Sequence, residues 1–72
     1  MLRIKEIKKG ETFYERGEKF IALEDAKKSQ EGGLTQWSVP GRSAVKGELI
    51  AFLETEGAEH YGPRLEREPP EP

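Results

Sequence analysis

Large apolar side chains gather on both sides of one glycine turn in the first third of the chain. Five of them flank residues 16–18, namely Phe13, Tyr14, Phe20, Ile21 and Leu23. Aromatic and β-branched residues around a glycine are typical of a β-hairpin, so residues 10–25 predict one. The apolar positions fall on both faces of the two strands. This suits a bent strand pair in a small barrel better than a flat sheet.

The pairing within this hairpin depends on which residues form its turn. A two-residue loop at Gly17-Glu18 gives one register, and a type I turn with Gly17 in the left-handed conformation gives another. Before the hairpin, residues 2–8 begin with strict alternation of apolar and charged positions and then slip by one. We expect a first strand from about Leu2 to Lys8 with a bulge near Glu6.

The segment after the hairpin allows two interpretations. Residues 18–31 are rich in helix formers and end at Gly32-Gly33, but the second half of this segment offers no apolar stripe. We therefore expect the strand to continue to about Asp25 and a polar loop to follow through Gly33. Residues 34–39 alternate again and form the next strand. Pro40-Gly41 is expected to close that strand as a type II turn.

Residues 47–53 form a short continuous apolar run, which is consistent with a strand buried on both sides. A helix over about residues 43–56 is the alternative, with Ser43 as N-cap and Gly57 after its last turn. Gly47 inside that helix and two glutamates at its negative end argue against it. We therefore favour the strand.

The last apolar anchors precede an acidic, proline-rich end. Tyr61 is expected to pin a final short strand or turn, and residues 66–72 are expected to form a disordered tail after a domain that spans residues 1–65. The strand count and turn spacing predict an all-β fold, a meander of about five strands curled into an SH3-like, partly open barrel. The alternative fold class is α+β, with the helix at 43–56.

Length and composition limit what this fold can do alone. The chain has 72 residues, of which 33% are hydrophobic and 36% charged. A domain this small needs nearly every large apolar side chain, or a partner surface, to complete its core. Self-association or partner binding is thus an expectation. Such a short chain would be unsurprising in a bacterial or phage genome.

Cysteine is absent, which excludes disulfides and thiolate metal sites. No apolar run reaches the length of a membrane span, and the N-terminus lacks the apolar core of a signal peptide. We therefore expect a cytoplasmic protein with no membrane partner. The net charge of −2 is unevenly spread, because residues 1–9 carry +3 and residues 48–72 carry −5. Neither block is dense enough to identify a partner.

No stretch of the chain carries a catalytic, cofactor or metal motif. The only histidine, His60, stands near Glu54, Glu56 and Glu59, but nothing in the spacing makes these side chains converge on a metal. A surface histidine in an acidic segment is the better interpretation. The serines have no companion nucleophile motif. We expect neither an enzyme nor a bound cofactor.

Nucleic-acid binding is the alternative function, because small barrels often bind single strands through aromatic side chains beside basic ones. Trp37, Tyr14 and Phe13 would supply the stacking. The basic candidates are Arg3, Lys5, Lys8, Lys9 and Lys46, with Arg42 beside them. The sequence pI of about 5.4 argues against this function, since nucleic-acid modules commonly carry a positive excess.

Protein binding is the function that the sequence favours. A small domain with an open sheet edge, little core and no site for chemistry is suited to an interface, as a subunit or a small modulator of a larger assembly. Aromatic residues and arginine are the most frequent interface anchors. The predicted binding residues are Trp37, Tyr61, Arg42 and Tyr14.

Overall fold

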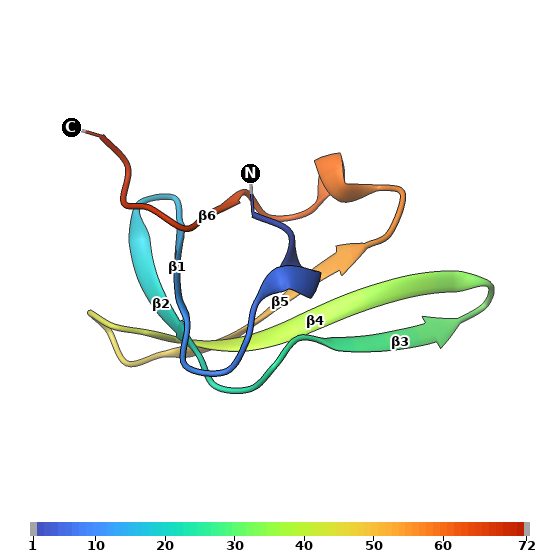
Figure 1. The fold of residues 1–72 in the computed structure, drawn as a ribbon, viewed down its shortest axis with the longest axis horizontal. Coiled ribbons are helices and arrows are strands. Elements are labelled where there is room, and N and C mark those ends of the chain that lie inside the picture. The colour runs from blue at the N-terminus through green and yellow to red at the C-terminus, as the bar shows by residue number, and fades with distance from the viewer. Residues whose placement is uncertain (1, 72) are drawn as a thin grey trace.

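The computed structural model describes residues 2–71, which form one curled antiparallel sheet (Figure 1). Its strands are β1 (Thr12–Glu15), β2 (Glu18–Ala22), β3 (Lys27–Glu31), β4 (Leu34–Ser43), β5 (Leu49–Thr55) and β6 (Leu65–Glu66). Two short 3-10 turns, η1 (Ile4–Glu6) and η2 (Glu59–Tyr61), complete it. The all-β, partly open fold predicted from the sequence is confirmed, since the sheet does not close.

β4 is the longest strand and organises the sheet. The strand order is β3-β4-β2-β1-β6, with β5 paired to β4 outside this path. β3 pairs with the first half of β4, and β2 pairs with its last three residues. β5 runs beside β4 from Gln36 to Arg42. Figure 1 shows the result, a long ribbon of β3, β4 and β5 with the β1–β2 hairpin and β6 curled over one end.

The predicted hairpin at residues 16–18 is confirmed, and its turn is now defined. Phe13 pairs with Phe20, and Glu15 pairs with Glu18. The loop is therefore Arg16-Gly17, with φ of 52° and 81°. Positive φ at both positions is the type I′ turn whose twist matches that of the strands. Neither of the two turns proposed from the sequence placed the loop there.

The core lies between the curled hairpin and the ribbon. Among residues 2–71 the buried apolar side chains are Leu2, Ile4, Ile7, Phe13, Phe20, Ala22, Val39, Phe52 and Leu65. At its centre the Phe52 ring lies edge-on to Phe13 and Phe20, with centroid distances of 5.3 and 4.9 Å. Edge-to-face contacts of this kind stabilise beyond the area that they bury. This cluster joins β1, β2 and β5.

The predicted strand at residues 2–8 is wrong. The chain instead makes the 3-10 turn η1, and only Leu2 forms a bridge, with its N–H donating to the carbonyl of Leu65 at 2.9 Å. Side chains three residues apart lie on the same side of a 3-10 turn. Ile4 and Ile7 therefore both enter the core, which accounts for the slip in the sequence pattern.

The polar loop predicted through Gly33, and the rival helix, are also wrong, because β2 ends at Ala22 and residues 27–31 form β3. Every side chain of β3 is exposed. The strand forms without an apolar face because Gly32 and Gly33, with φ of 59° and 81°, make a second type I′ turn into β4.

Pro40-Gly41 is not a turn, since β4 continues through it to Ser43. Pro40 lies where β4 changes partner from β3 to β2, and its carbonyl accepts the N–H of Leu23 at 2.9 Å. Gly41 lets the core rings approach the strand closely. A Cβ there would lie 3.0 Å from the Phe13 ring and 3.1 Å from the Phe52 ring.

The predicted strand over the apolar run is confirmed as β5, and the alternative helix at 43–56 is wrong because residues 44–46 form a turn. The expectation that this strand is buried on both sides is also wrong. Only Phe52 and Glu54 of its seven residues are buried. The other face of β5 has nothing over it among the described residues.

The C-terminal part is anchored by Leu65, not by Tyr61. Leu65 is fully buried and pairs in β6 with Glu15 of β1, whereas Tyr61 is 84% exposed. Arg67 follows β6, and its guanidinium lies 3.3 Å from the carboxylate of Glu11. The disorder of residues 66–72 stays a prediction. Met1 of the predicted domain and Pro72 of the tail lie outside the described residues.

Candidate binding surface

β5 presents two different faces because its side chains alternate. Phe52 and Glu54 point into the molecule, opposite Val39 and Trp37 of β4. Leu49, Ala51 and Leu53 point to the other side, and Leu49 and Leu53 are 65% and 50% exposed. Exposed leucines at alternate positions of one strand form an apolar row on the sheet surface.

Neighbouring strands extend this row into a surface that we call the outer face. Across from β5, Arg42 pairs with Leu49, Pro40 with Ala51 and Ser38 with Leu53. Arg42 in turn pairs with Ile21 of β2, which is also exposed. The outer face therefore consists of Ile21, Ser38, Pro40, Arg42, Leu49, Ala51 and Leu53. It is an apolar patch with one cation, the composition that marks interaction surfaces.

One edge of β5 is unpaired within the described chain, because β5 pairs with β4 alone. Ser43 N–H donates to the Glu48 carbonyl and Glu56 N–H to the Thr35 carbonyl, each at 2.9 Å. These bonds extend the β4–β5 register, in which bonded and non-bonded pairs alternate. The even residues of β5 therefore bond to β4. The N–H and C=O groups directed outward are those of Leu49, Ala51 and Leu53.

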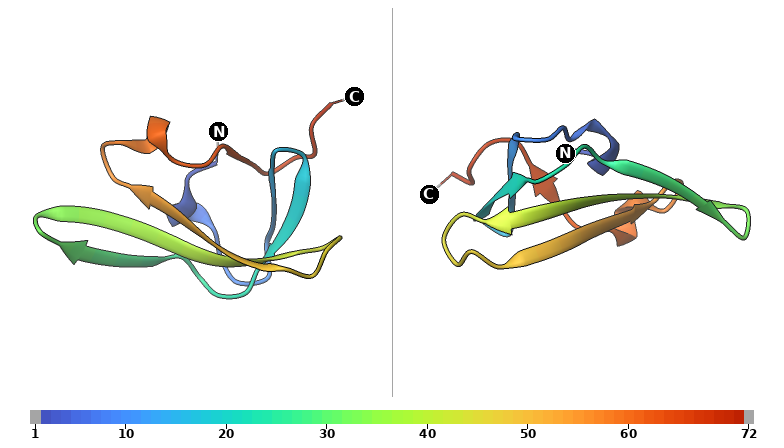
Figure 2. Two further views of the ribbon diagram at one scale, coloured as in Figure 1. Left: turned by 180° about the vertical axis from the view of Figure 1, so that it is seen from behind. Right: turned by 90° about the horizontal axis from the view of Figure 1, so that it is seen from below.

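We call these outward backbone groups the β5 edge. Seen from below in the right-hand view of Figure 2, β5 runs along one margin of the ribbon with β4 on its inner side. The Thr55 carbonyl at the end of β5 accepts the N–H of Ala58 at 3.0 Å, so the strand stops there. An unpaired strand edge beside exposed leucines is a template for another strand.

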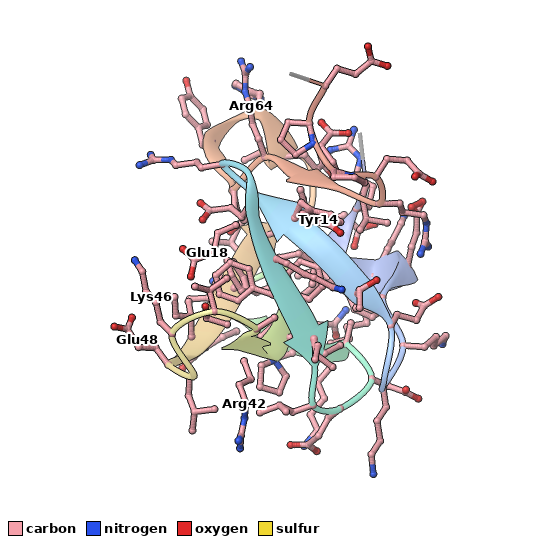
Figure 3. All side chains as sticks on the ribbon, turned by 90° about the vertical axis from the view of Figure 1, so that its left-hand side faces the viewer. Tyr14, Glu18, Arg42, Lys46, Glu48 and Arg64 are labelled. Atoms are coloured by element: carbon pink, nitrogen blue, oxygen red, sulfur yellow. The ribbon has the colours of Figure 1, made fainter. Side chains whose placement is uncertain are left out.

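The structure brings only one predicted binding residue to this surface. Arg42 is exposed and belongs to the outer face. Figure 3 shows Arg42 pointing away from the domain at the bottom of the view, whereas Tyr14 lies higher, on the ribbon of β1. Tyr14 is half-buried on β1, between Lys19 and Glu66. Tyr61 is on η2, with its ring 4.0 Å from that of His60.

Trp37 points inward from β4, on the face opposite to Arg42. It is half-buried and packs against the core, and its indole N–H is buried with no hydrogen-bond partner among the described residues. A buried donor without a partner is costly, so the ring is held there by packing. Trp37 and Arg42 cannot contact one partner segment on a single face of the sheet.

The basic residues of the alternative function are dispersed. Arg3 and Lys5 belong to the η1 region, and Lys8 and Lys9 follow it in an exposed loop. Lys46 is on the turn between β4 and β5, where its ammonium group lies 3.8 Å from Glu18 (Figure 3). The side chain of Arg3 is partly buried, and its positive charge lowers the pKa of Glu54. Lys46 therefore lies in a different part of the molecule from the other four cations.

Two carboxylates near the end of β5 have shifted pKa values. Burial raises the pKa of Glu54, and the charge of Arg3 opposes this shift. The pKa of Glu59 is lowered, because its carboxylate accepts the N–H of Gly57 at 2.9 Å. Glu59 and His60 line a hollow of about 180 Å³. A carboxyl group with a lowered pKa is almost fully deprotonated near neutral pH and so has little proton to donate as a general acid.

No group of three metal-ligating side chains converges within residues 2–71. In the same part of the chain, neither 3-10 turn has the length or apolar character needed to cross a bilayer, and longer helices are lacking. The hollows are lined by mixed polar and charged side chains, such as Glu6, Glu66 and Arg67. The outer face and the β5 edge are thus the features that best fit a partner.

Sequence reasoning missed Leu49, Leu53 and Ile21 as surface residues. A continuous apolar run carries no sign of which face will be covered, so the run was interpreted as buried on both sides. The one feature of the sequence that indicated an exposed face was the shortage of apolar residues elsewhere in the chain, which leaves too few to cover both faces of β5. No protein family model matches this chain, and no curated protein or solved structure matches it either. Its function has therefore to be inferred from its own residues.

Proposed function

We propose that this chain is a non-enzymatic protein-binding module, a cytoplasmic subunit or small modulator of a larger assembly, which adds a partner's strand to the β5 edge. The observation that supports the proposal is β5 itself, a seven-residue, mostly apolar strand that is paired on one side only within residues 2–71. Added strands bind through main-chain hydrogen bonds, and alternate side chains supply specificity.

The outer face would supply that specificity. A strand added along β5 places its alternate side chains beside Leu49 and Leu53, and Arg42 lies one strand further in. Burying two half-exposed leucines contributes about 1–3 kcal/mol. Apolar contacts at the centre and a cation beside them are common in protein interfaces. The SH3-like description of the curled sheet stays a prediction, and the proposal rests on the β5 edge alone.

Replacing Ala51 by proline tests this function directly. The N–H of Ala51 faces the free edge, so Ala51→Pro removes a donor to the partner and leaves the bonds to β4 in place. The matched control is Gln30→Pro on β3. The Glu31–Leu34 pair closes a two-residue turn, and the β3–β4 bonds alternate from it, so the N–H of Gln30 also faces outward.

Both variants and the parent domain would be immobilised and exposed to a lysate of the source cells, with and without nuclease. The proposal expects one protein to be retained by the parent and by Gln30→Pro, and to be lost from Ala51→Pro. Retention that Ala51→Pro does not change would contradict the site. Retention that disappears with nuclease would instead favour nucleic-acid binding, with Arg3, Lys5, Lys8, Lys9 and Lys46 as residues to replace.

A further inference from the structure

We infer that the strand added to β5 is the β5 of a second copy, so that two chains form a symmetric dimer with one continuous sheet. This inference rests on the proposed function and names its partner. In a two-fold dimer the same surface meets itself, and two β5 strands then run antiparallel. The N–H and C=O groups of Ala51 would pair with those of Ala51 in the second copy.

The side chains of the outer face support this register. The outward sequence Leu49, Ala51, Leu53 is the same in both directions. With Ala51 on the two-fold axis, Leu49 of each copy lies directly across from Leu53 of the other. Opposed apolar side chains on adjacent strands stabilise a sheet, and both leucines are exposed in the single chain.

The inner side of the edge is also complementary. Ile50 is 37% exposed although it points to the same side of the sheet as Phe52. In the proposed register Ile50 of one copy lies across from Phe52 of the other. Self-pairing would thus cover the three large apolar residues that β5 exposes, which are Leu49, Leu53 and Ile50.

Charge favours the antiparallel orientation. Residues 42–48, which lead into β5, carry Arg42, Lys46 and Glu48 and sum to +1, and Glu18 of β2 lies 3.8 Å from Lys46. Residues 54–59 sum to −3, and Arg3 and Lys5 lie close enough for their charges to favour the ionised forms of Glu54 and Glu59. Antiparallel pairing brings the turn that holds Lys46 in one copy near the end of β5 that holds Glu54 in the other. Complementary charge of this kind selects orientation and partner.

The remaining edges of the sheet explain why pairing would stop at two copies. β3 is entirely polar, with two lysines in five residues, and such charges oppose edge pairing. β6 has only two residues. One usable edge on each chain produces a closed dimer, whereas two usable edges would produce a filament.

The first test is sedimentation equilibrium of the parent domain, Ala51→Pro and Gln30→Pro. A single strand pair is a small interface, so the parent and Gln30→Pro should dimerise with a dissociation constant of roughly 10 µM to 1 mM. Ala51→Pro removes both hydrogen bonds at the two-fold axis and should weaken the dimer at least about tenfold. Circular dichroism would check that each variant is folded.

Glu48→Lys supplies a test in the opposite direction. In the proposed register Glu48 lies across from Glu54 of the second copy, the one like-charged pair between the two strands. Replacing Glu48 by lysine should therefore strengthen the dimer, by about tenfold at low salt, with a smaller gain at high salt. An unchanged or weaker dimer would contradict the register.

Because the chain has no cysteine, a single introduced cysteine can test the proposed register by disulfide cross-linking. Paired residues at the axis have Cα atoms about 5.5 Å apart, within the range of a disulfide, so Ala51→Cys should give a covalent dimer on mild oxidation. Ser29→Cys is the control, because five strand spacings of about 4.8 Å would separate its two copies. Equal cross-linking of both variants would overturn the inference.

The two proposals fail differently. A parent domain that stays monomeric at 1 mM, or an Ala51→Pro variant that dimerises like the parent, overturns self-pairing. The protein-binding function would still stand if capture from lysate depended on Ala51. If the parent domain neither dimerises nor retains a protein in a way that depends on Ala51, both proposals are wrong.

Discussion

β3 and β5 lie on opposite sides of β4, and they are stabilised in different ways. β3 has five exposed polar residues and is joined to β4 by a tight two-glycine turn. β5 places Phe52 in the core and leaves Leu49 and Leu53 in solvent. The first strand depends on its turn and backbone bonds, and the second depends on the core.

This difference shows that the two outer strands of the ribbon differ in how readily they could pair with another strand. Lysine-rich strands are poor templates for other strands, whereas long apolar ones are good templates. The chain protects the β3 edge and leaves the β5 edge open. In a domain whose core is so small, an open apolar edge is most simply explained by a partner.

The largest expected effect separates the two strands by their contact with the core. Phe52→Ala removes a ring that contacts Phe13 and Phe20, and should lower the free energy of unfolding by about 3–5 kcal/mol. Lys27→Ala on β3 should change it by less than about 0.5 kcal/mol, because the pair with Glu24 is exposed. Urea unfolding measures both. Equal losses would mean that β3 also contributes to the core.

A smaller effect is expected at Gly41, where β4 passes between the two strands. Gly41→Ala would place a methyl group 3.0 Å from Phe13 and 3.1 Å from Phe52, so the rings must move. The expected loss of stability is about 1–3 kcal/mol. Ser38→Ala on the outer face is the control, and thermal unfolding is the measurement. If Gly41→Ala left the stability unchanged, the aromatic cluster would have space for an added methyl group, contrary to this prediction.

A change in the turn between β3 and β4 should affect only the strands beside it. Gly33 has φ of 81°, a conformation that costs a residue with a side chain about 1–2 kcal/mol. Gly33→Ala should therefore speed amide hydrogen exchange in β3 by roughly fivefold to thirtyfold. Exchange at Phe52 in β5 should not change, because that strand opens with the core. Equal acceleration in both strands would refute this independence.

The smallest effect concerns pH. Burial raises the pKa of Glu54 above 4.5, so the folded state binds its proton more readily than the unfolded state does. This contribution to stability is fully present below pH 4.5 and is lost as pH rises through the folded pKa. The stability of the parent relative to Glu54→Gln should therefore fall from pH 4 toward pH 7. Glu31→Gln on β3 is the exposed control. Urea midpoints of both variants and the parent, measured across this pH range, test the prediction. A relative stability that rises with pH would mean that folding lowers the pKa of Glu54.

Short sequence patterns were sufficient to predict several of the secondary-structure elements. The glycine between aromatic residues located the β1–β2 hairpin, and the apolar run located β5, because a turn residue and β-rich neighbours act over a few positions. The hairpin register needed the φ angles of Arg16 and Gly17. Arg42 was the one predicted binding residue that reached the candidate surface.

Other elements could not be predicted from short stretches of the sequence. β3 has no apolar side chain, and it is a strand because the Gly32-Gly33 turn aligns its backbone with β4. Pro40-Gly41 looks like a turn, but it lies where β4 changes partner and where the core rings need space. The scattering of Trp37, Tyr14 and Tyr61 over separate faces depends on strand order, which no short segment encodes.

From the residues alone followed the fold class, the first hairpin and the presence of a strand near residues 47–53, since these depend on neighbouring positions. The tertiary structure decided which face of β5 was covered and which of its edges stayed open. Phe52 and Leu53 are adjacent and similarly apolar, and only the position of the curled hairpin places one in the core and leaves the other half exposed. Burial depends on contacts between distant segments, and such contacts exist only once the sheet has formed.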